Sequence, residues 1–253
     1  MNTKYLAVFF TIVIICTILL PVYSGMLPAD FTKCKVGDNA CVRDKMQELY
    51  EKFPKGNPSL ALPDISALYM ENITVARANS GSPLQLDFKF LDLINYGIET
   101  AKVINTTGWI KDPSIIEVDA EIPLLKLVGH YQVKGKILLF NLKGEGKATF
   151  ELTDCKIHLK GRVKLEKRSN GKNYLKPIKL IATLEPKEVV VQMENLINGN
   201  KELSDSVNAI INENWRDIWE ELRDGTNNVI SQLYFTIIGN VLNVLSYDDF
   251  FAK

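Results

Sequence analysis

The chain has 253 residues, with 30 basic and 30 acidic side chains, so its formal net charge at pH 7 is zero. Because the basic residues are scattered and form no stripe, this charge pattern argues against a nucleic-acid-binding surface. The hydrophobic content of 46% is that of an ordinary folded protein.

The first element in the chain is a short apolar run. Lys4 precedes apolar residues 6–20, and small residues near Ser24 fit a signal peptidase site, so we expect a signal peptide over 1–24 and a secreted protein. A membrane anchor is the alternative, but the run is shorter than the roughly 20 residues needed to span, and Pro21 ends it. Residues 25–253 contain no linker or repeat, which predicts a single domain.

The cysteines after the expected signal peptide are Cys34, Cys41 and Cys155. Cys34 and Cys41 flank a turn-forming segment, KCKVGDNAC, and an oxidising compartment makes them a disulfide. Cys155 is left over and could form an intermolecular bond. It shares strand parity with apolar residues, however, which predicts a buried and inert thiol.

A first helix is predicted from about Cys41 to Phe53, capped by Asp38 or Asn39 and ended by Pro54. The helix has one apolar face, made of Val42, Met46, Leu49, Tyr50 and Phe53.

Alternating apolar and polar residues then predict half-buried strands, starting at Leu84, Val118 and Leu142. The first of these patterns places Leu84, Leu86, Phe88 and Phe90 on the inward face, and the second places Val118, Ala120, Ile122 and Leu124 there. The alternation changes phase at Pro123 and again at Thr153-Asp154, as a β-bulge would cause. Hairpin turns are expected at Gly135-Lys136 and Asn170-Gly171. The pattern is typical of a long, strongly bent antiparallel meander.

Two sequons are present, Asn72-Ile73-Thr74 and Asn105-Thr106-Thr107. Each lies beside an expected surface turn, so Asn72 and Asn105 are candidate glycosylation sites.

The C-terminal part has helical periodicity from Leu203 to Leu245. Some 43 residues at 1.5 Å per residue would form a rod of roughly 60 Å, which Asp224-Gly225 could kink or divide. A coiled coil is the alternative, but the 3.6-residue period and the preceding strands favour a sheet-wrapped helix. The expected fold class is therefore α+β, with a long C-terminal helix wrapped by a highly curved antiparallel sheet.

The order of several segments resembles the takeout and juvenile hormone binding protein family of insects. These segments are the Cys34 to Cys41 stretch, LALPDISALY, VGHYQVKGKILLFNLKGEGKATFELTDCKIHL, NGKNYLK and ENLINGNKELSDSVNAIINENWRDIWEELRD. The chain is closer to the takeout branch, because Cys155 has no partner for a second bridge. The resemblance implies half of a tubular lipid-binding fold, with an apolar tunnel for a terpenoid, a fatty acid or a related lipid.

The long apolar side chains on the inward faces are candidates for lining such a tunnel, although core packing explains the same pattern. They are Phe88, Phe90, Tyr131, Phe140, Leu142, Phe150, Trp215, Trp219 and Leu222. The Tyr131 hydroxyl could bind a ligand head group or the protein backbone.

We therefore predict a secreted monomeric carrier of a small hydrophobic ligand, with no cofactor, metal, nucleic acid or stable membrane insertion. His130 and His158 occupy polar strand positions away from any metal-ligand spacing, and no nucleophile motif is present, so no enzyme activity is expected. One alternative is a glycoprotein with a packed interior that meets a receptor. Another is membrane-surface attachment through Trp215 and Trp219, which the acidic helix face disfavours.

Overall fold

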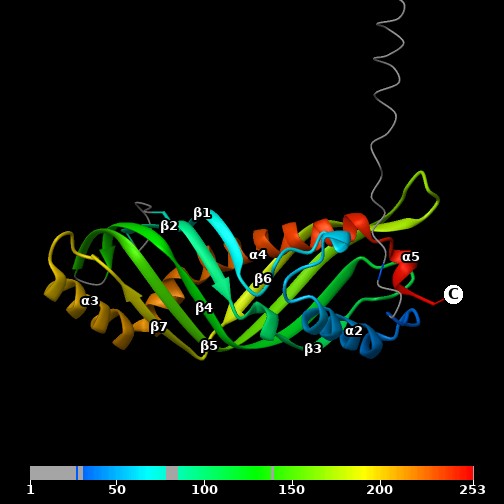
Figure 1. Cartoon of the computed structure of the whole chain (residues 1–253), viewed down its shortest axis with the longest axis horizontal. Coiled ribbons are helices and arrows are strands. Elements are labelled where there is room, and N and C mark those ends of the chain that lie inside the picture. The colour runs from blue at the N-terminus through cyan, green and yellow to red at the C-terminus, as the bar shows by residue number, and fades with distance from the viewer. Residues whose placement is uncertain (1–26, 28–30, 78–84, 138–139, 253) are drawn as a thin grey trace, which may run out of the picture.

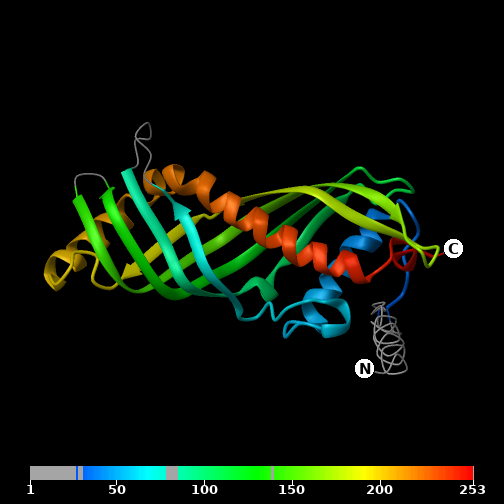
Figure 2. The ribbon, with the colours of Figure 1, turned by 90° about the horizontal axis from the view of Figure 1, so that it is seen from above.

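The computed structural model describes residues 27, 31–77, 85–137 and 140–252. The expected signal peptide and Leu84 lie outside these residues. In the described part, a curved sheet extends along the molecule and helix α4 (Trp215–Val244) runs along its open side (Figures 1 and 2). Helices α2 (Asn39–Lys52) and α5 (Tyr247–Phe250) lie at one end, and α3 (Lys201–Glu213) lies at the other. The predicted fold class is confirmed.

Helix α2 begins two residues earlier than expected and has the expected cap. The Asp38 carboxylate accepts a hydrogen bond from the Cys41 backbone N–H at 3.0 Å, which satisfies one of the free donors of the first turn. The helix ends where the Phe53 N–H reaches the Leu49 carbonyl, directly before Pro54. A crossing segment with the short helix η1 (Pro58–Leu60) then leads to the sheet.

The described residues form one antiparallel sheet of seven strands. The strands are β1 (Leu68–Ala76), β2 (Gln85–Tyr96), β3 (Lys102–Thr107), β4 (Ile115–Ile137), β5 (Phe140–Lys167), β6 (Asn173–Glu185) and β7 (Glu188–Met193). Helix η2 (Ile98–Thr100) joins β2 to β3. The order is β1-β2-β4-β5-β6, with β3 also on β4 and β7 also on β5. The two long central strands, β4 and β5, therefore pair with each other, and each has two successive neighbours on its outer side, β2 and β3 on β4, and β6 and β7 on β5.

The two predicted phase changes lie opposite each other in the β4–β5 ladder. The register passes from Ile122↔Cys155 to Leu124↔Thr153, so Pro123 faces Asp154 and no residue is gained in either strand. Asp154 has a φ of +45°, and Pro123 cannot donate to the ladder. In place of the expected bulge, β4 and β5 both change phase at the same point and stay in register. Leu124, predicted to face inward, is 42% exposed because the phase has already changed there.

One of the two predicted hairpin turns is confirmed and the other is wrong. Asn170-Gly171 is confirmed, since the Gly171 N–H closes a turn on the Arg168 carbonyl at 2.9 Å. Gly135-Lys136 is wrong, because these residues continue the ladder opposite Leu142 and Asn141. The β4–β5 connection falls at residues 138–139, outside the described part.

The expected single C-terminal rod is two helices, and the division is at Asn214 between α3 and α4, not at Gly225. Gly225 lies inside α4, where a Cβ atom would overlap the carbonyl oxygen of Val75 in β1. Its role is close packing of the helix against the edge of the sheet.

Helix α4 also covers the other edge of the sheet. The Ser231 hydroxyl and the Asn227 side-chain oxygen accept hydrogen bonds from the N–H groups of Ala182 and Leu184 in β6. The free edge of β6 is thereby satisfied without another strand. None of the described helices is long and apolar enough to cross a membrane.

Candidate ligand-binding site

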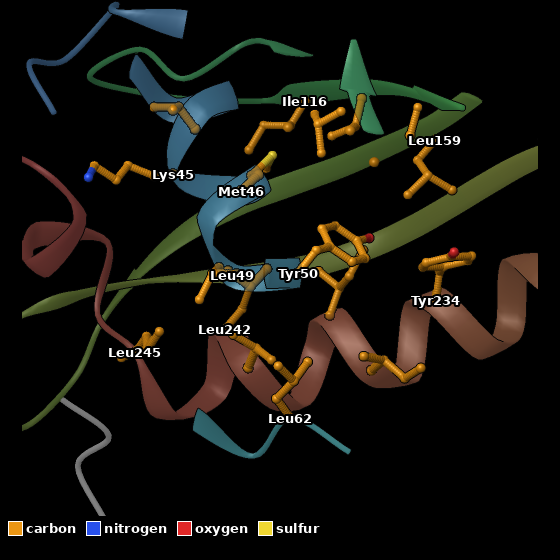
Figure 3. Close-up of a pocket in the computed structure, with 18 of the residues that line it drawn as sticks. Lys45, Met46, Leu49, Tyr50, Leu62, Ile116, Leu159, Tyr234, Leu242 and Leu245 are labelled. Atoms are coloured by element: carbon orange, nitrogen blue, oxygen red, sulfur yellow. The ribbon is translucent and has the colours of Figure 1, made fainter. Parts of the chain in front are cut away.

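A cavity of about 280 Å³ lies between α2, α4 and the inner face of the sheet (Figure 3). This volume is close to the lower end of the roughly 300 to 1,000 Å³ found for small-molecule sites. Most of its lining side chains are aliphatic, and they come from α2, β4, β5 and α4. Those from the two central strands are Ile116, Val118, Ala120, Ile122, Ile157, Leu159 and Val163.

The sequence pattern explains how these residues reach the cavity. In β4 the alternation from Ile116 to Ile122 turns every second side chain inward, and β5 supplies the matching set from Ile157 to Val163. Gly161 belongs to the inward set of β5 and leaves room in the cavity wall, since a Cβ there would touch only the Ile116 carbonyl oxygen, at 3.7 Å. On α2, four of the five predicted apolar-face residues line the cavity, namely Val42, Met46, Leu49 and Tyr50.

The end of the cavity near α5 is closed by the two terminal segments of the described chain. Cys34 pairs with Phe251, with its N–H bonded to the Phe250 carbonyl at 3.3 Å and its carbonyl bonded to the Ala252 N–H at 2.8 Å. The predicted Cys34–Cys41 disulfide is present, with an S–S distance of 2.03 Å. It ties this closing segment to α2, so both pieces of the cavity wall are held together.

An aromatic cluster supports the same end of the cavity. Trp109 stacks on Tyr247 with ring centroids 6.4 Å apart, and Phe251 packs edge-on against Tyr247 at 4.9 Å. The Tyr247 hydroxyl donates to the Ile110 carbonyl at 2.7 Å, and burial raises the pKa of this phenol to about 12.

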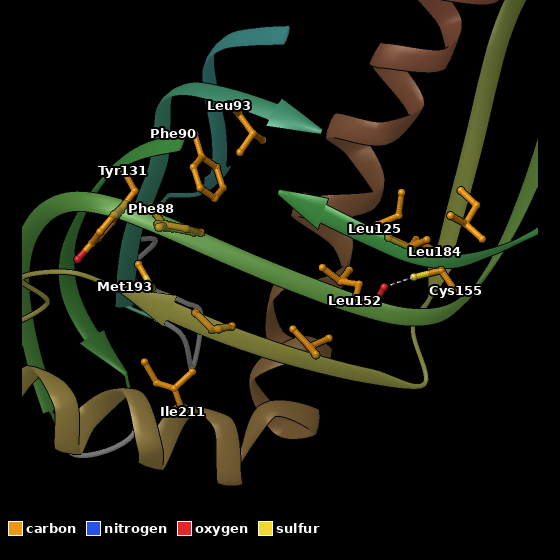
Figure 4. Packing of buried hydrophobic residues seen from close by; sticks show 14 of the residues in the cluster. Phe88, Phe90, Leu93, Leu125, Tyr131, Leu152, Cys155, Leu184, Met193 and Ile211 are labelled. Atoms are coloured by element: carbon orange, nitrogen blue, oxygen red, sulfur yellow. Dashed lines mark hydrogen bonds between the residues drawn. The ribbon is translucent and has the colours of Figure 1, made fainter. Parts of the chain in front are cut away.

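The predicted tunnel residues gather elsewhere, and none of the nine lines this cavity. Phe88, Phe90 and Phe150 pack ring against ring, with centroids 5.0 to 6.0 Å apart. Figure 4 shows Phe88 and Phe90 in this part of the interior. Leu142 is buried in the same core, while Phe140, Trp215 and Trp219 are half-buried against it and Leu222 is half-buried on α4. Whether these residues contact a ligand stays a prediction.

Tyr131 binds the backbone, which was one of the two expectations for it. The side chain is 0% exposed, and its hydroxyl donates to the Glu194 carbonyl at 2.7 Å. Burial raises the pKa of Tyr131, so the phenol stays neutral. Its hydroxyl already has a partner and is not free for a ligand.

Cys155 is buried, as predicted, and is 0% exposed. Its Sγ contacts the Leu152 carbonyl oxygen at 3.5 Å (Figure 4). Burial raises the pKa of the thiol to about 12, so the reactive thiolate is absent near neutral pH.

Both sequon asparagines are exposed, but neither lies beside a turn as expected. Asn72 is inside β1 and has a φ of +54°. It has no partner in the β1–β2 register, which passes from Glu71↔Asp92 to Ile73↔Phe90. Asn105 is inside β3, next to a register shift against β4.

In the described ranges, no group of three or more His, Cys, Asp or Glu side chains could hold a metal ion. The two histidines lie on the outside of the sheet, where His130 Nδ1 is 2.9 Å from the Asp92 carboxylate and His158 Nδ1 is 2.7 Å from the Asp119 carboxylate.

Comparison with known proteins identifies the family. The family of haemolymph juvenile hormone binding proteins matches residues 9–252, which is most of the chain. The protein belongs to this family. The resemblance drawn from the segments of the sequence is therefore confirmed, and the haemolymph juvenile hormone binding protein family comprises carriers of hydrophobic ligands rather than enzymes.

The chain is also similar to individual proteins. The circadian clock-controlled protein daywake of Drosophila melanogaster is 23% identical over 232 residues, covering 89% of this chain and 88% of daywake. Daywake of Drosophila yakuba is 23% identical over 230 residues, covering 88% of each chain. The crystal structure of Epiphyas postvittana Takeout 1 superposes with a TM-score of 0.77 at 26% identity, covering 88% of this chain and all of Takeout 1.

The residues that line the cavity are not among the predicted tunnel residues, because that set is made mainly of large aromatic side chains. The cavity is lined mainly by medium-sized aliphatic residues from the second half of α4 and the ends of β4 and β5 that lie closest to α2. One feature of the sequence could have indicated the cavity. Gly161 occupies an inward-facing position of its strand, and a glycine there leaves the buried face without a side chain.

Proposed function

We propose that this protein is a secreted carrier that holds a small hydrophobic ligand in the cavity between α2, α4 and the sheet. The observation that carries the proposal is an internal space of about 280 Å³ whose walls are almost wholly apolar. Ligand sites of this kind remove hydrocarbon from water and use few polar groups for orientation. Family membership supports the carrier role in general.

The free energy gained by burying the apolar surface of a ligand is large enough for useful affinity. Burying roughly 400 Å² of apolar ligand surface at about 25 cal/mol per Å² is worth on the order of 10 kcal/mol. The loss of ligand freedom offsets part of this gain, so dissociation constants between nanomolar and micromolar are expected.

Secretion as a single monomeric domain completes the proposal. It rests on the expected signal peptide over 1–24 and on the Cys34–Cys41 disulfide, which is typical of oxidising compartments. The exposed Asn72 and Asn105 are accessible to glycosylation there.

We propose that the nine residues predicted from the sequence make only secondary contacts with a ligand. Phe88, Phe90 and Phe150 fill their part of the interior with ring contacts, so a ligand would reach them only if these rings moved. They are therefore expected to matter for ligands longer than the cavity.

The test is native mass spectrometry of protein secreted from insect cells, followed by solvent extraction and titration with the fluorescent apolar probe N-phenyl-1-naphthylamine. A stoichiometric lipid adduct, or saturable uptake of one probe per chain, is the expected result. A ligand-free mass together with no probe uptake would overturn the carrier and favour the alternative of a packed interaction protein.

A further inference from the structure

Three aliphatic side chains are exposed on neighbouring segments at the end of the molecule that carries α2 and α5 (Figure 1). They are Val36, Ile110 and Ile115, which are 47%, 52% and 46% exposed. Val36 is in the turn before α2, Ile110 is in the β3–β4 loop, and Ile115 is the first residue of β4. The Tyr247 hydroxyl of α5 donates to the Ile110 carbonyl at 2.7 Å, which fixes the loop beside α5. We call the three aliphatic residues the apolar tip.

Main-chain contacts hold the three segments of the apolar tip together. The Gly37 N–H donates to the Trp109 carbonyl at 2.8 Å, which joins the turn before α2 to the β3–β4 loop. A Cβ atom at Gly108 would overlap the carbonyl oxygen of Ile115, so the start of the loop lies against the start of β4. The three side chains therefore belong to one place on the surface.

The segments that carry the apolar tip also close the cavity. Trp109, Ile116 and Cys34, which lie one or two residues from the tip residues in the chain, are buried and line the cavity. The tip residues themselves are absent from the described lining. Packing inside the protein therefore does not explain three aliphatic side chains at these positions. A cluster of exposed apolar residues rimmed by polar ones marks an interaction site.

Each residue of the apolar tip has a basic neighbour. These neighbours are Lys35 beside Val36 and Lys111 beside Ile110 in the chain, and Arg162 opposite Ile115 in the β4–β5 register. All three basic side chains are exposed, and none of them forms an ion pair with a described residue. The hydrocarbon of the tip is thus rimmed by cations that the protein itself does not pair.

The acidic side chains at this end leave an excess of positive charge. Asp38 caps α2, and Asp248 accepts a hydrogen bond from the first N–H of β6. Asp249 pairs with Lys172 at 2.9 Å. Asp112 is exposed and offsets one of the three basic charges around the apolar tip. A surface with this excess is attracted to the phosphate groups of lipids.

We propose that the apolar tip and its three basic neighbours dock the protein reversibly on a phospholipid membrane. The aliphatic side chains enter the head-group region, and the ammonium and guanidinium groups contact lipid phosphates. A stable protein interface buries about 20 residues or more on each side, whereas the apolar tip has three. A few inserted side chains with a basic rim fit a lipid surface better. Docking in this way would place the end wall of the cavity against the membrane.

The experiment is flotation of the secreted full chain with lipid vesicles. One set of vesicles is phosphatidylcholine alone, and the other contains phosphatidylcholine and phosphatidylserine in a three to one ratio. The apolar variant combines Val36→Ser, Ile110→Ser and Ile115→Ser. The charge variant combines Lys35→Gln, Lys111→Gln and Arg162→Gln.

Each variant has a matched control away from the apolar tip. The apolar control replaces three aliphatic residues of similar exposure on β6 and β7, with Ile178→Ser, Ile181→Ser and Val190→Ser. The charge control replaces three exposed lysines of β4 and β5, with Lys134→Gln, Lys143→Gln and Lys147→Gln. Thermal unfolding of all four variants checks that the exposed substitutions leave the fold intact.

The wild type is expected to bind the mixed vesicles, and to bind phosphatidylcholine vesicles more weakly. The apolar and charge variants should each bind the mixed vesicles at least tenfold more weakly, because each lacks one of the two contributions to docking. Added salt should weaken binding of the wild type, since it screens the basic groups. Both control variants should bind as the wild type does.

Several outcomes would overturn the docking surface. These are no vesicle binding by the wild type, equal binding by the wild type and both tip variants, or equal losses in the tip variants and their controls. Binding to insect cells but not to vesicles of their extracted lipids would assign the tip to a protein partner instead. Dimerisation that is lost only in the apolar variant would assign it to a second copy of the chain.

The docking surface is tested separately from the carrier function, because uptake of N-phenyl-1-naphthylamine is measured on the same samples. The apolar variant should keep this uptake, since its three residues do not line the cavity. If the wild type takes up the probe without binding vesicles, the docking surface falls and the carrier stands. If it binds vesicles through the tip without taking up the probe, the docking surface stands and the carrier falls.

Discussion

The Asn208 carboxamide on α3 pairs with the main chain of Met193 on β7, accepting from its N–H at 3.0 Å and donating to its carbonyl at 2.8 Å. One helical turn later, Asn212 makes the same two contacts with Val191, at 2.8 and 2.9 Å. The two asparagines thus continue the hydrogen-bond ladder along the free edge of β7. They fix α3 on the sheet and block the addition of another strand.

Replacing these amides should therefore be costly. Asn208→Ala leaves the N–H and carbonyl of Met193 without side-chain partners, and we expect a loss of about 1 to 3 kcal/mol in the free energy of unfolding. Urea denaturation measures this loss. Ser206→Ala, on the exposed face of the same helix, is the matched control, and equal midpoints for the two variants would contradict the edge-pairing role.

Two glycines in α4 should respond to alanine in opposite directions. A Cβ at Gly225 would overlap the Val75 carbonyl, whereas one at Gly239 would meet only Pro177 Cγ, at 3.6 Å. Gly239→Ala should stabilise the protein by up to about 1 kcal/mol through better helix propensity. Gly225→Ala should destabilise it by about 1 to 3 kcal/mol, because the helix must move from β1. Thermal unfolding of both variants tests the pair, and a stabilised Gly225→Ala would show that α4 is not held against β1.

Filling the cavity from Gly161 should weaken ligand binding without unfolding the protein. Its backbone angles are ordinary for any residue and its inward side is open, so Gly161→Leu places a side chain in the cavity. We expect at least a tenfold weaker affinity for N-phenyl-1-naphthylamine, with unchanged or higher thermal stability. Gly161→Ala, which fills little of the space, is the control. Full probe affinity in Gly161→Leu would place the ligand elsewhere.

Stability should fall in alkali through Cys155. The ordinary thiol pKa is 9.0 and burial raises it to about 12 in the folded protein. Below pH 9 both states keep the proton, so the thiol adds no pH dependence. From pH 9 to about 12 the unfolded thiol releases its proton while the folded one keeps it, so the free energy of unfolding decreases as pH rises.

Two measurements check this behaviour. Ellman's reagent at pH 8 should label Cys155 only after unfolding, and rapid labelling of the native protein would contradict its burial. Cys155→Ala should show a smaller loss of stability than wild type between pH 9 and 10. Equal slopes would assign the alkaline loss to other groups, such as Tyr247, whose pKa burial also raises.

Local chemistry was sufficient to predict some of the individual elements from the sequence. The Asp38 cap and Pro54 bound α2, and alternation identified the inward sides of β2, β4 and β5 because side chains in a strand point to opposite faces in turn. The Cys34–Cys41 disulfide followed from close spacing across a turn.

Only the tertiary structure decided where the interior is filled and where it is empty. Phe88 and Ile116 have the same inward parity, yet Phe88 packs against other rings and Ile116 lines a cavity. Likewise, Gly225 resembled a helix break and is a packing contact with Val75. Periodicity reports which side of an element is buried, whereas a cavity depends on the summed volumes of side chains from α2, α4 and the paired strands β4 and β5. The space left between these side chains is defined only once the elements have packed together.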